Sequence, residues 1–586
     1  MRLVEVRLLD GPNLYRLEPA AKIEVTVGRQ RTWYGQRAPA AYALVRLGRA
    51  VPRAAAPPPV RDLAAWARRL HGLTGTHVER LPGHAVPVTI HRTSEPGHWI
   101  VAFPWREQDR AREIAEGAWR LADHEVDPRI APSRSRGLRR VLERVAAAHG
   151  PAPAWITDQQ RRIPVVSISG TNGKSTTTRM LTHILRRADR HVGTTTSDGV
   201  LVDERLMEAG DWTGPAGAAQ ILGRSDLDVA VLETARGGIL LRGVGYQSNE
   251  VAILTNVSSD HLDLQGIHTL PELAEVKAVI TRITRPEGTV VLNADDALVA
   301  AQARRVRAPV CLFSLTATSP PIRRHVRRGG RAVVVDDGWM VGLWGATREP
   351  IVPVDELPST LFGSARHNVA NALAAAAGAQ ALGVPAPAIA DGLRDYRPTV
   401  DQAPGRLNLY RLGARVVIVD FAHNEAGVGV LLDVAEAIAG GAAGRRRPIT
   451  IIIGTAGDRP DDTLRGIGRI AAERADHVVI KETLGYLRGR TRESAIGEFQ
   501  AGLREGGLVG AAPTYPSEPA ALRAVLANGA GTATHANEPA VVALMCHEDR
   551  DGVATLLQEL GARPIGDRSE LLELMPRLHA RPDGGR

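Results

Sequence analysis

The chain has 586 residues, of which 44% are hydrophobic and 23% charged, and its formal net charge is +9. This length predicts several domains with cores of their own, and no apolar run approaches the ~20 residues of a membrane span. The two cysteines, Cys311 and Cys546, are too few for a disulfide framework or a cysteine-rich zinc site. Because the N-terminus shows no hydrophobic leader, we expect a cytoplasmic protein with no membrane partner.

The basic residues are mostly of one kind. Of the 73 lysines and arginines, only four are lysines, at Lys22, Lys174, Lys277 and Lys481. We interpret the arginine excess as a compositional bias, so nucleic acid is not an expected partner, and the basic run 323–331 is predicted to be a solvated loop. A lysine amine can lose its proton and react, whereas an arginine cannot, so the surviving lysines are expected where that chemistry is required.

In chain order, residues 1–130 predict a small α/β unit that docks a substrate or serves as an accessory. The Pro-, Ser- and Arg-rich residues 131–162 predict a linker with one basic helix. Short Val/Ile-rich runs then alternate with helices, which is typical of parallel sheets buried on both faces. We therefore predict a multidomain α/β protein with a central domain at 163–400, a C-terminal domain at 401–565 and a loosely held tail at 566–586.

The strongest motif is the run G-T-N-G-K-S-T, which follows a buried strand and opens a helix. In such a loop the backbone N–H groups face an anion, the lysine reaches the β- and γ-phosphates, and the hydroxyl binds Mg²⁺. The general phosphate-loop pattern has glycine where this chain has Ile168, but the strand–turn–helix context favours a nucleotide site over a structural glycine turn. The predicted ATP-binding residues are Gly170, Thr171, Asn172, Gly173, Lys174, Ser175 and Thr176.

This loop resembles that of the Mur ligase superfamily, and the likeness extends to E-T-A-R-G-G-I-L, S-A-R-H-N-V-A-N-A-L, A-P-G-R-L-N and V-D-F-A-H-N. The chain is most similar to the Mur-ligase-like half of the cyanophycin synthetases. The resemblance implies a central domain that binds ATP and a C-terminal domain that closes over it. Cyanophycin synthetases also carry an ATP-grasp domain, and only the predicted linker stands at its place. We therefore expect a partner enzyme or a different acid substrate.

A metal site is predicted around Glu233, which ends an apolar strand. A carboxylate at the carboxyl end of a parallel strand faces the ligand crevice, where it can hold Mg²⁺ beside Ser175. The resemblance implies His261 as a further metal ligand. It also implies that the amine of Lys277 carries CO₂ as a carbamate and holds a second Mg²⁺. The alternatives are a strand-end surface acid, a structural histidine and a lysine that extends along the surface.

The remaining site residues are implied by the resemblance. Asn368 and Asn371 share a helix face, which would border the adenine, although Asn368 could instead cap that helix. Arg406 would reach the phosphates across the domain boundary, and Asp420 would contact the ribose. Weaker expectations for substrate contact are Thr195, Thr196, Asp211, His423, Asp458, Arg459, Arg488 and Arg490.

Three functions remain open. The first is a cyanophycin-synthetase-like ligase that uses ATP to join arginine or another amino acid to a carboxylate of a small-molecule or peptide acid, through an acyl phosphate. The second is a ligase of the folylpolyglutamate or peptidoglycan-precursor type. The third is a phosphate-loop protein that binds nucleotide to regulate a partner or nucleic acid and ligates nothing. A homo-oligomer is compatible with all three.

Overall fold

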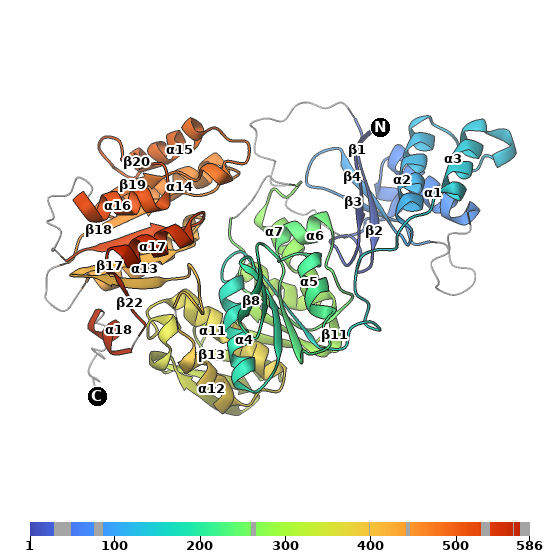
Figure 1. Ribbon diagram of the computed structural model, residues 1–586. Helices are drawn as coiled ribbons and strands as arrows, with labels where there is room; N and C mark the ends of the chain where they lie inside the picture. The colour runs from blue at the N-terminus through green and yellow to red at the C-terminus, as the bar shows by residue number, and fades with distance from the viewer. Residues whose placement is uncertain are drawn as a thin grey trace.

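The computed structural model describes residues 1–28, 49–74, 86–259, 265–397, 399–440, 446–528, 539–566 and 568–574. Three β-sheets follow one another along the chain, each with its own helices (Figure 1). Within these described ranges, no helix has the length and apolar character needed to cross a membrane. The α/β multidomain class predicted from the sequence is confirmed.

The first sheet is antiparallel, with strand order β1-β2-β4-β3. Its elements are β1 (Arg2–Leu9), β2 (Ala20–Thr26), β3 (Thr89–Arg92), β4 (His98–Pro104), α1 (Pro58–Leu73), α2 (Gln108–Asp123) and α3 (Arg136–Ala147). Helix α3 lies in the segment predicted as a linker, yet its apolar face, with Leu138, Val141 and Val145, packs into the core of this sheet. The basic helix is therefore part of the N-terminal unit.

The central sheet has eleven strands in the order β15-β14-β13-β12-β11-β10-β5-β9-β6-β7-β8. The strands from β13 to β6 run parallel, and the outer strands add antiparallel hairpins at both edges. The strands are β5 (Val165–Ser169), β6 (Val192–Thr195), β7 (Gly199–Val202), β8 (Arg205–Ala209), β9 (Val229–Glu233), β10 (Asn249–Leu254), β11 (Thr284–Asn293), β12 (Val310–Ser314), β13 (Arg331–Asp336), β14 (Trp339–Trp344) and β15 (Thr347–Pro353).

Helices cover both faces of this sheet, which explains why its inner strands are almost wholly apolar. One face carries α4 (Lys174–Arg187), α11 (Arg366–Ala381) and α12 (Ala386–Asp395). The other carries α5 (Pro215–Leu222), α6 (Arg236–Leu241), α7 (Leu270–Lys277), α8 (Val279–Arg282), α9 (Ala297–Ala300) and α10 (Pro320–Arg327). The prediction of a loop at 323–331 is wrong, because α10 occupies most of it and its Ile322 is buried in the core.

The third sheet has seven strands in the order β20-β19-β18-β21-β17-β16-β22, of which the first five run parallel. Its strands are β16 (Asn408–Leu412), β17 (Arg415–Asp420), β18 (Ile449–Ile453), β19 (His477–Lys481), β20 (Thr514–Tyr515), β21 (Val541–Met545) and β22 (Arg563–Pro564). Its helices are α13 (Glu425–Ala439), α14 (Asp461–Arg474), α15 (Arg492–Glu505), α16 (Glu518–Asn528), α17 (Arg550–Glu559) and α18 (Arg568–Leu574).

Candidate functional site: the cleft between the central and C-terminal sheets

A cleft of about 900 Å³ separates the central sheet from the C-terminal sheet. Its central wall is built from residues that follow β5, β9 and β10 and from the start of α11. Its C-terminal wall is built from residues that follow β17, β18 and β21. Because the carboxyl ends of parallel strands are where open α/β sheets bind ligands, this cleft is the candidate site.

The predicted phosphate loop lies on the central wall. Gly173, at φ +82°, caps α4, and a Cβ there would stand 2.1 Å from Oδ1 of Asn371. Only glycine therefore allows the loop to approach α11 so closely. Lys174 begins α4, and its Nζ donates to the Thr171 carbonyl at 2.9 Å. Of the loop residues predicted to bind ATP, all but Gly170 line the cleft.

Glu233 ends β9 with its side chain almost fully buried in this wall. Burial raises the pKa of its carboxyl, whereas the charge of Lys174 and a hydrogen bond from Ser175 lower it. Its Oε2 has no hydrogen-bond partner among the described residues. A buried oxygen without a partner is costly, and a divalent cation that prefers oxygen ligands would satisfy it, so the residues present fit Mg²⁺.

Lys277 is the last residue of α7 and lines the cleft with only 4% of its surface exposed. Its Nζ donates to the Gly170 carbonyl at 2.7 Å. The alternative of a lysine extended along the surface is therefore wrong. His261 lies outside the described residues, within which no three His, Cys, Asp or Glu side chains form a metal-binding group.

Helix α11 begins at Arg366, so Asn368 lies inside the helix and does not cap it. Asn368 and Asn371 share one face as predicted, and Nδ2 of Asn371 donates to Oδ1 of Asn368 at 3.1 Å. Both residues line the cleft beside the phosphate loop. Burial lowers the pKa of the neighbouring His367 to about 4, so its imidazole is neutral at pH 7.

Arg406 and Asp420 stand on the C-terminal wall. The guanidinium of Arg406 lies over the ring of Phe421, 4.4 Å from its centroid. Asp420 accepts a hydrogen bond from the Leu407 N–H at 2.9 Å, and burial raises the pKa of its carboxyl despite the nearby charge of Arg406. These two contacts join the segment that carries Arg406 and Leu407 to the segment that carries Asp420 and Phe421.

Five of the weaker expectations also reach the cleft: Asp211, His423, Asp458, Arg459 and Arg488 line it. Arg488 donates to Asp458 at 2.7 Å and lies over the ring of Tyr486 at 5.3 Å. This cluster presents charged and aromatic groups to a ligand.

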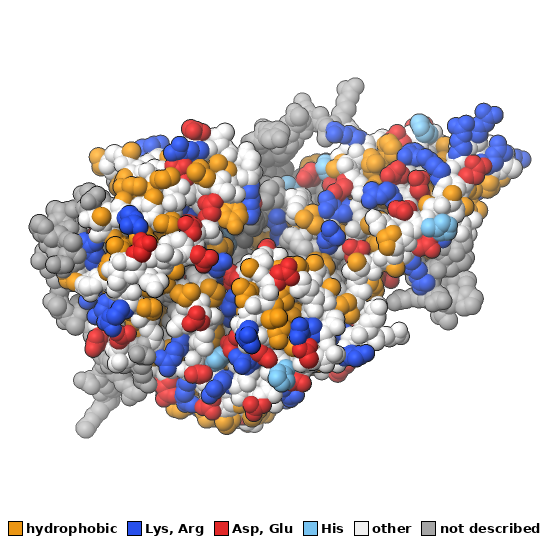
Figure 2. Space-filling model, viewed as in Figure 1, with side chains coloured by type: hydrophobic (Ala, Val, Ile, Leu, Met, Phe, Trp, Pro, Cys, Tyr) orange, Lys and Arg blue, Asp and Glu red, His pale blue; other side chains and the backbone are white. Residues whose placement is uncertain are grey.

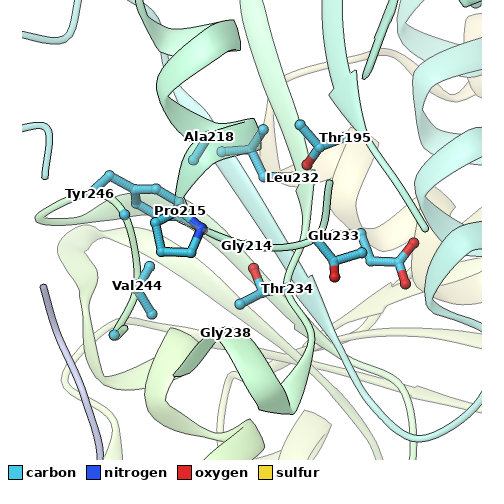
Figure 3. Close-up of a pocket in the computed structure, with 13 residues that line it drawn as sticks. Thr195, Gly214, Pro215, Ala218, Leu232, Glu233, Thr234, Gly238, Val244 and Tyr246 are labelled. Carbon is cyan, nitrogen blue, oxygen red and sulfur yellow. The ribbon is translucent and has the colours of Figure 1, made fainter. Parts of the chain in front are cut away.

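The other three weaker expectations lie behind the wall. Thr195 is buried beside Leu232 at a cavity of about 10 Å³, which has room for roughly one water molecule. Figure 3 shows Thr195 at this cavity, with the Glu233 carboxylate pointing away from Tyr246. Thr196 is fully buried, and its N–H donates to Gly199. Arg490 donates to backbone carbonyls of the loop that carries Arg459, so it braces this loop.

Sequence reasoning missed an ion pair that joins the two walls. Arg550, at the start of α17, donates to Oδ1 of Asp198 at 2.7 Å, and Arg179 donates to Oδ2 of the same carboxylate at 3.2 Å. Burial alone would raise the pKa of Asp198, but the charges of Arg406, Arg550 and Arg179 together lower it. Arg550 carried no sequence signal in so arginine-rich a chain, whereas Asp198 lies two residues after Thr196, which was expected to contact substrate.

Comparison with known proteins identifies residues 168–379 as a Mur ligase middle domain, which confirms the resemblance inferred from the motifs. A cyanophycin synthetase from Nostoc sp. is 40% identical over 338 residues, which cover 58% of this chain and 37% of that protein. The chain thus spans little more than a third of the length of that relative.

Two more distant proteins are also similar. A UDP-N-acetylmuramyl-tripeptide synthetase from Deinococcus radiodurans is 29% identical over 62% of this chain and 70% of its own length. A solved structure of a bifunctional folylpolyglutamate synthase/dihydrofolate synthase with Mn, AMPPNP and L-glutamate bound is 20% identical. It covers 68% of this chain and 89% of that chain, with a TM-score of 0.49.

Proposed function

We propose, from the Mur ligase middle domain at 168–379 and the cleft in front of it, that this chain is an ATP-dependent amide ligase. The observation that carries the proposal is the pairing of the two walls. The phosphate loop with Lys174 lies on one wall, and Arg406 lies on the other wall of the same cleft. The similarity to cyanophycin synthetases, at 40% identity, supports the same conclusion.

The reaction follows from placing an acid and an amine in this cleft with ATP. A carboxylate oxygen attacks the γ-phosphorus, the bond to ADP breaks, and an acyl phosphate forms. The amine then attacks the acyl carbon, phosphate leaves, and the nitrogen loses a proton to give the amide. Such phosphoryl transfers are accelerated mainly by positioning and by neutralising charge, which Lys174 and Arg406 supply from opposite sides.

Ser175 and Glu233 would hold a first Mg²⁺, which neutralises phosphate charge when bound. The unpartnered Oε2 of Glu233 supports this role. Lys277 would hold a second Mg²⁺ as a carbamate, together with His261, and its burial in the cleft supports a role other than a surface one. The face with Asn368 and Asn371 would bind the adenine, Asp420 the ribose, and the rest of the loop the phosphates.

For the substrates, we propose an amino acid, with arginine as the first candidate, and a carboxylate of a small-molecule or peptide acid. The support is the identity to cyanophycin synthetases and the charged cluster of Asp458, Arg459 and Arg488 on the C-terminal wall. A partner enzyme that prepares the acid is part of the proposal, because only the short segment 131–162 stands where the cyanophycin synthetases carry their ATP-grasp domain. A cytoplasmic location fits this chemistry, which uses ATP.

The ligase of peptidoglycan-precursor type is the second candidate, favoured by the relative from Deinococcus radiodurans. Regulation through nucleic acid has less support. On the face shown in Figure 2, basic side chains are mixed with acidic and apolar ones over most of the surface, and one group of them gathers at the upper right, over α3. Nucleic-acid binding instead calls for clustered positive charge along the path of the phosphates.

The test is a phosphate-release screen that crosses candidate acids, including aspartate-containing peptides, with the amino acids. We expect release of ADP and phosphate that requires both an acid and an amine, and no release by the Lys174→Ala variant. ATP hydrolysis that ignores both substrates would contradict the ligase. Salt-sensitive RNA or DNA binding in its place would favour the regulatory alternative.

A further inference from the structure

Lys481 is one of the four lysines, and the proposed chemistry does not use it. It ends β19 in the C-terminal sheet, and its side chain has no exposed surface. Its Nζ donates to Oε1 of Glu518 at 2.6 Å and lies 3.0 Å from Nδ1 of His547. Burying an ammonium costs folding free energy unless its protons have hydrogen-bond partners. We therefore ask what the partners of Lys481 gain from its charge.

Neutralising the charge of Glu518 does not by itself explain why a lysine is buried at position 481. The Glu518 carboxylate also accepts three backbone N–H groups, from His547 at 2.8 Å, Glu548 at 3.0 Å and Asp549 at 2.8 Å. Burial would raise the pKa of this carboxyl, but Lys481 and these N–H groups hold it below its usual value. The carboxylate is thus already well satisfied by the turn after β21.

The second partner, His547, is fixed at both ring nitrogens. An ammonium can only donate hydrogen bonds, so Nδ1 of His547 must accept a hydrogen bond from Lys481. The Nε2–H then donates to the Ala422 carbonyl at 2.7 Å. This is the neutral ring in a single tautomer, with both nitrogens engaged, so His547 cannot serve as an acid or base although it lines the cleft.

The Ala422 carbonyl lies in the segment that follows β17 and forms the C-terminal wall. Phe421 in this segment contacts the His547 ring edge-on, with centroids 4.9 Å apart, and carries the Arg406 guanidinium on its ring at 4.4 Å. A continuous set of contacts therefore runs from Lys481 through His547 and Phe421 to Arg406.

We propose that Lys481 is a positioning residue, which locks His547 as an acceptor for its ammonium and thereby fixes the segment that holds Arg406 toward the phosphate loop. The proposal rests on the proposed function for the role of Arg406. The hydrogen-bonding part of it stands on the geometry alone. Lysine is needed because its compact ammonium reaches Glu518 and His547 together, whereas a planar guanidinium would need more room.

The environment of His547 determines what losing Lys481 does. Burial, followed by the charges of Lys481, His423 and Arg459, lowers the pKa of the ring far below its usual value. The charged and titratable groups around it are Lys481, Glu518, Glu548, Cys546, His423 and Arg459. Without Lys481, the negative charge of Glu518 remains and the pKa of His547 must rise.

The first measurement follows the ring itself, by NMR of the full chain with labelled histidine, where His547→Gln identifies the signal. In the wild type we expect one neutral tautomer with its proton on Nε2 from pH 6 to 8.5. In Lys481→Met we expect the Nδ1 and Nε2 signals to change, because Nδ1 has lost the donor that fixed the tautomer. Because an unpaired Glu518 could prevent folding, the variant Lys481→Met/Glu518→Gln removes both charges, and its ring should still lose the fixed Nδ1 partner.

The second measurement is acid- and amine-dependent phosphate release. We expect Lys481→Met to lose about tenfold in kcat at pH 8, because the neutral ring of His547 is no longer held in the tautomer that donates to Ala422. Lys22→Met is the matched control. It removes a partly buried lysine that is paired with Glu5 and Glu24 in the N-terminal sheet and does not line the cleft, so its rate should match the wild type.

Rescue separates positioning from simple stability. A glutamine amide can accept from Lys481 and donate to Ala422, so His547→Gln should keep most of the rate. Ring signals of His547 in Lys481→Met that match the wild type, or a rate loss equal to that of Lys22→Met, would overturn the proposal. If no acid and amine pair supports phosphate release, the proposed function fails while the NMR result still decides the hydrogen-bonding part.

Discussion

The two walls of the cleft are built in different ways. The central wall presents a contiguous run, 170–176, whose shape is set locally by a strand, a tight turn and a helix. The C-terminal wall collects Arg406, His547 and Arg550, which lie far apart in the sequence and meet only through the third sheet. A substitution in the central wall should therefore affect mainly the contact of that one side chain with the ligand. A substitution in the C-terminal wall should also displace the residues that pack against it.

The sharpest test of the first wall is Lys174→Ala. Lys174 faces the cleft, so its loss should remove phosphate stabilisation without opening a core. We expect turnover to fall about a thousandfold, which corresponds to roughly 4 kcal/mol of barrier. Turnover and thermal melting should be measured together, with Lys22→Ala as the control. Near-normal ligation by a folded Lys174→Ala variant would contradict the prediction that residues 170–176 bind the phosphates of ATP.

Substitutions of Lys277 test whether the central wall also needs a carbamate on the amine of this residue. Lys277→Arg keeps the positive charge but cannot form a carbamate, so we expect it to lose about a hundredfold in rate, almost as much as Lys277→Ala. Short carboxylic acids should partly restore the alanine variant by filling the vacated ligand position. Rates are compared at saturating MgATP. If Lys277→Arg keeps more than about a tenth of the rate, less than ~1.4 kcal/mol of barrier has been lost, and the carbamate is excluded.

The same contrast explains what could be predicted from the sequence. The phosphate loop and the strand-end Glu233 follow from local patterns, the asparagine pair of α11 follows from the family resemblance, and the structure brings all of them to one cleft. The order of strands and helices in the second and third sheets also followed from Val/Ile-rich runs alternating with helices. These features depend on residues close together in the chain.

What the sequence did not predict depends on tertiary contacts. The buried face of α3 becomes visible only when it packs in the core with α2. The basic run forms a helix whose Ile322 and Val326 pack on the central core. The partner of Asp198 is 352 positions away in a chain full of arginine, so no local pattern could single out Arg550. The family resemblance placed Thr195 and Thr196 at the substrate, yet both residues are buried behind the wall.

The Asp198–Arg550 ion pair joins the two walls, so substitutions in it test whether the two walls depend on each other. Asp198→Asn and Arg550→Gln should each lower the rate about tenfold, since each loosens the approach of the C-terminal sheet to the phosphate loop. The double variant should be little worse than either single one, with a coupling of about 1 kcal/mol or more. Losses that simply multiply would show that the two residues act independently.

The smallest expected effect is on stability, and its pH dependence identifies Asp198 as the group responsible. Three arginines hold the pKa of this carboxyl below its unfolded value, so its charge stabilises the fold fully above about pH 4. That contribution is lost as the pH falls through the lower, folded-state pKa. Asp198→Asn lacks the charge at every pH, so the wild type should melt about 2–4 °C higher at pH 6.

The difference in melting temperature should then shrink steadily below about pH 4, because the wild-type carboxyl takes up its proton there and becomes as neutral as asparagine. Asp226→Asn provides the control, since Asp226 pairs with Arg224 on the exposed surface, where an ion pair contributes little. That variant should melt like the wild type throughout. A gap for Asp198→Asn that stays constant from pH 6 to pH 3 would mean that the lost stability comes from packing, and that the three arginines do not hold the two walls through this charge.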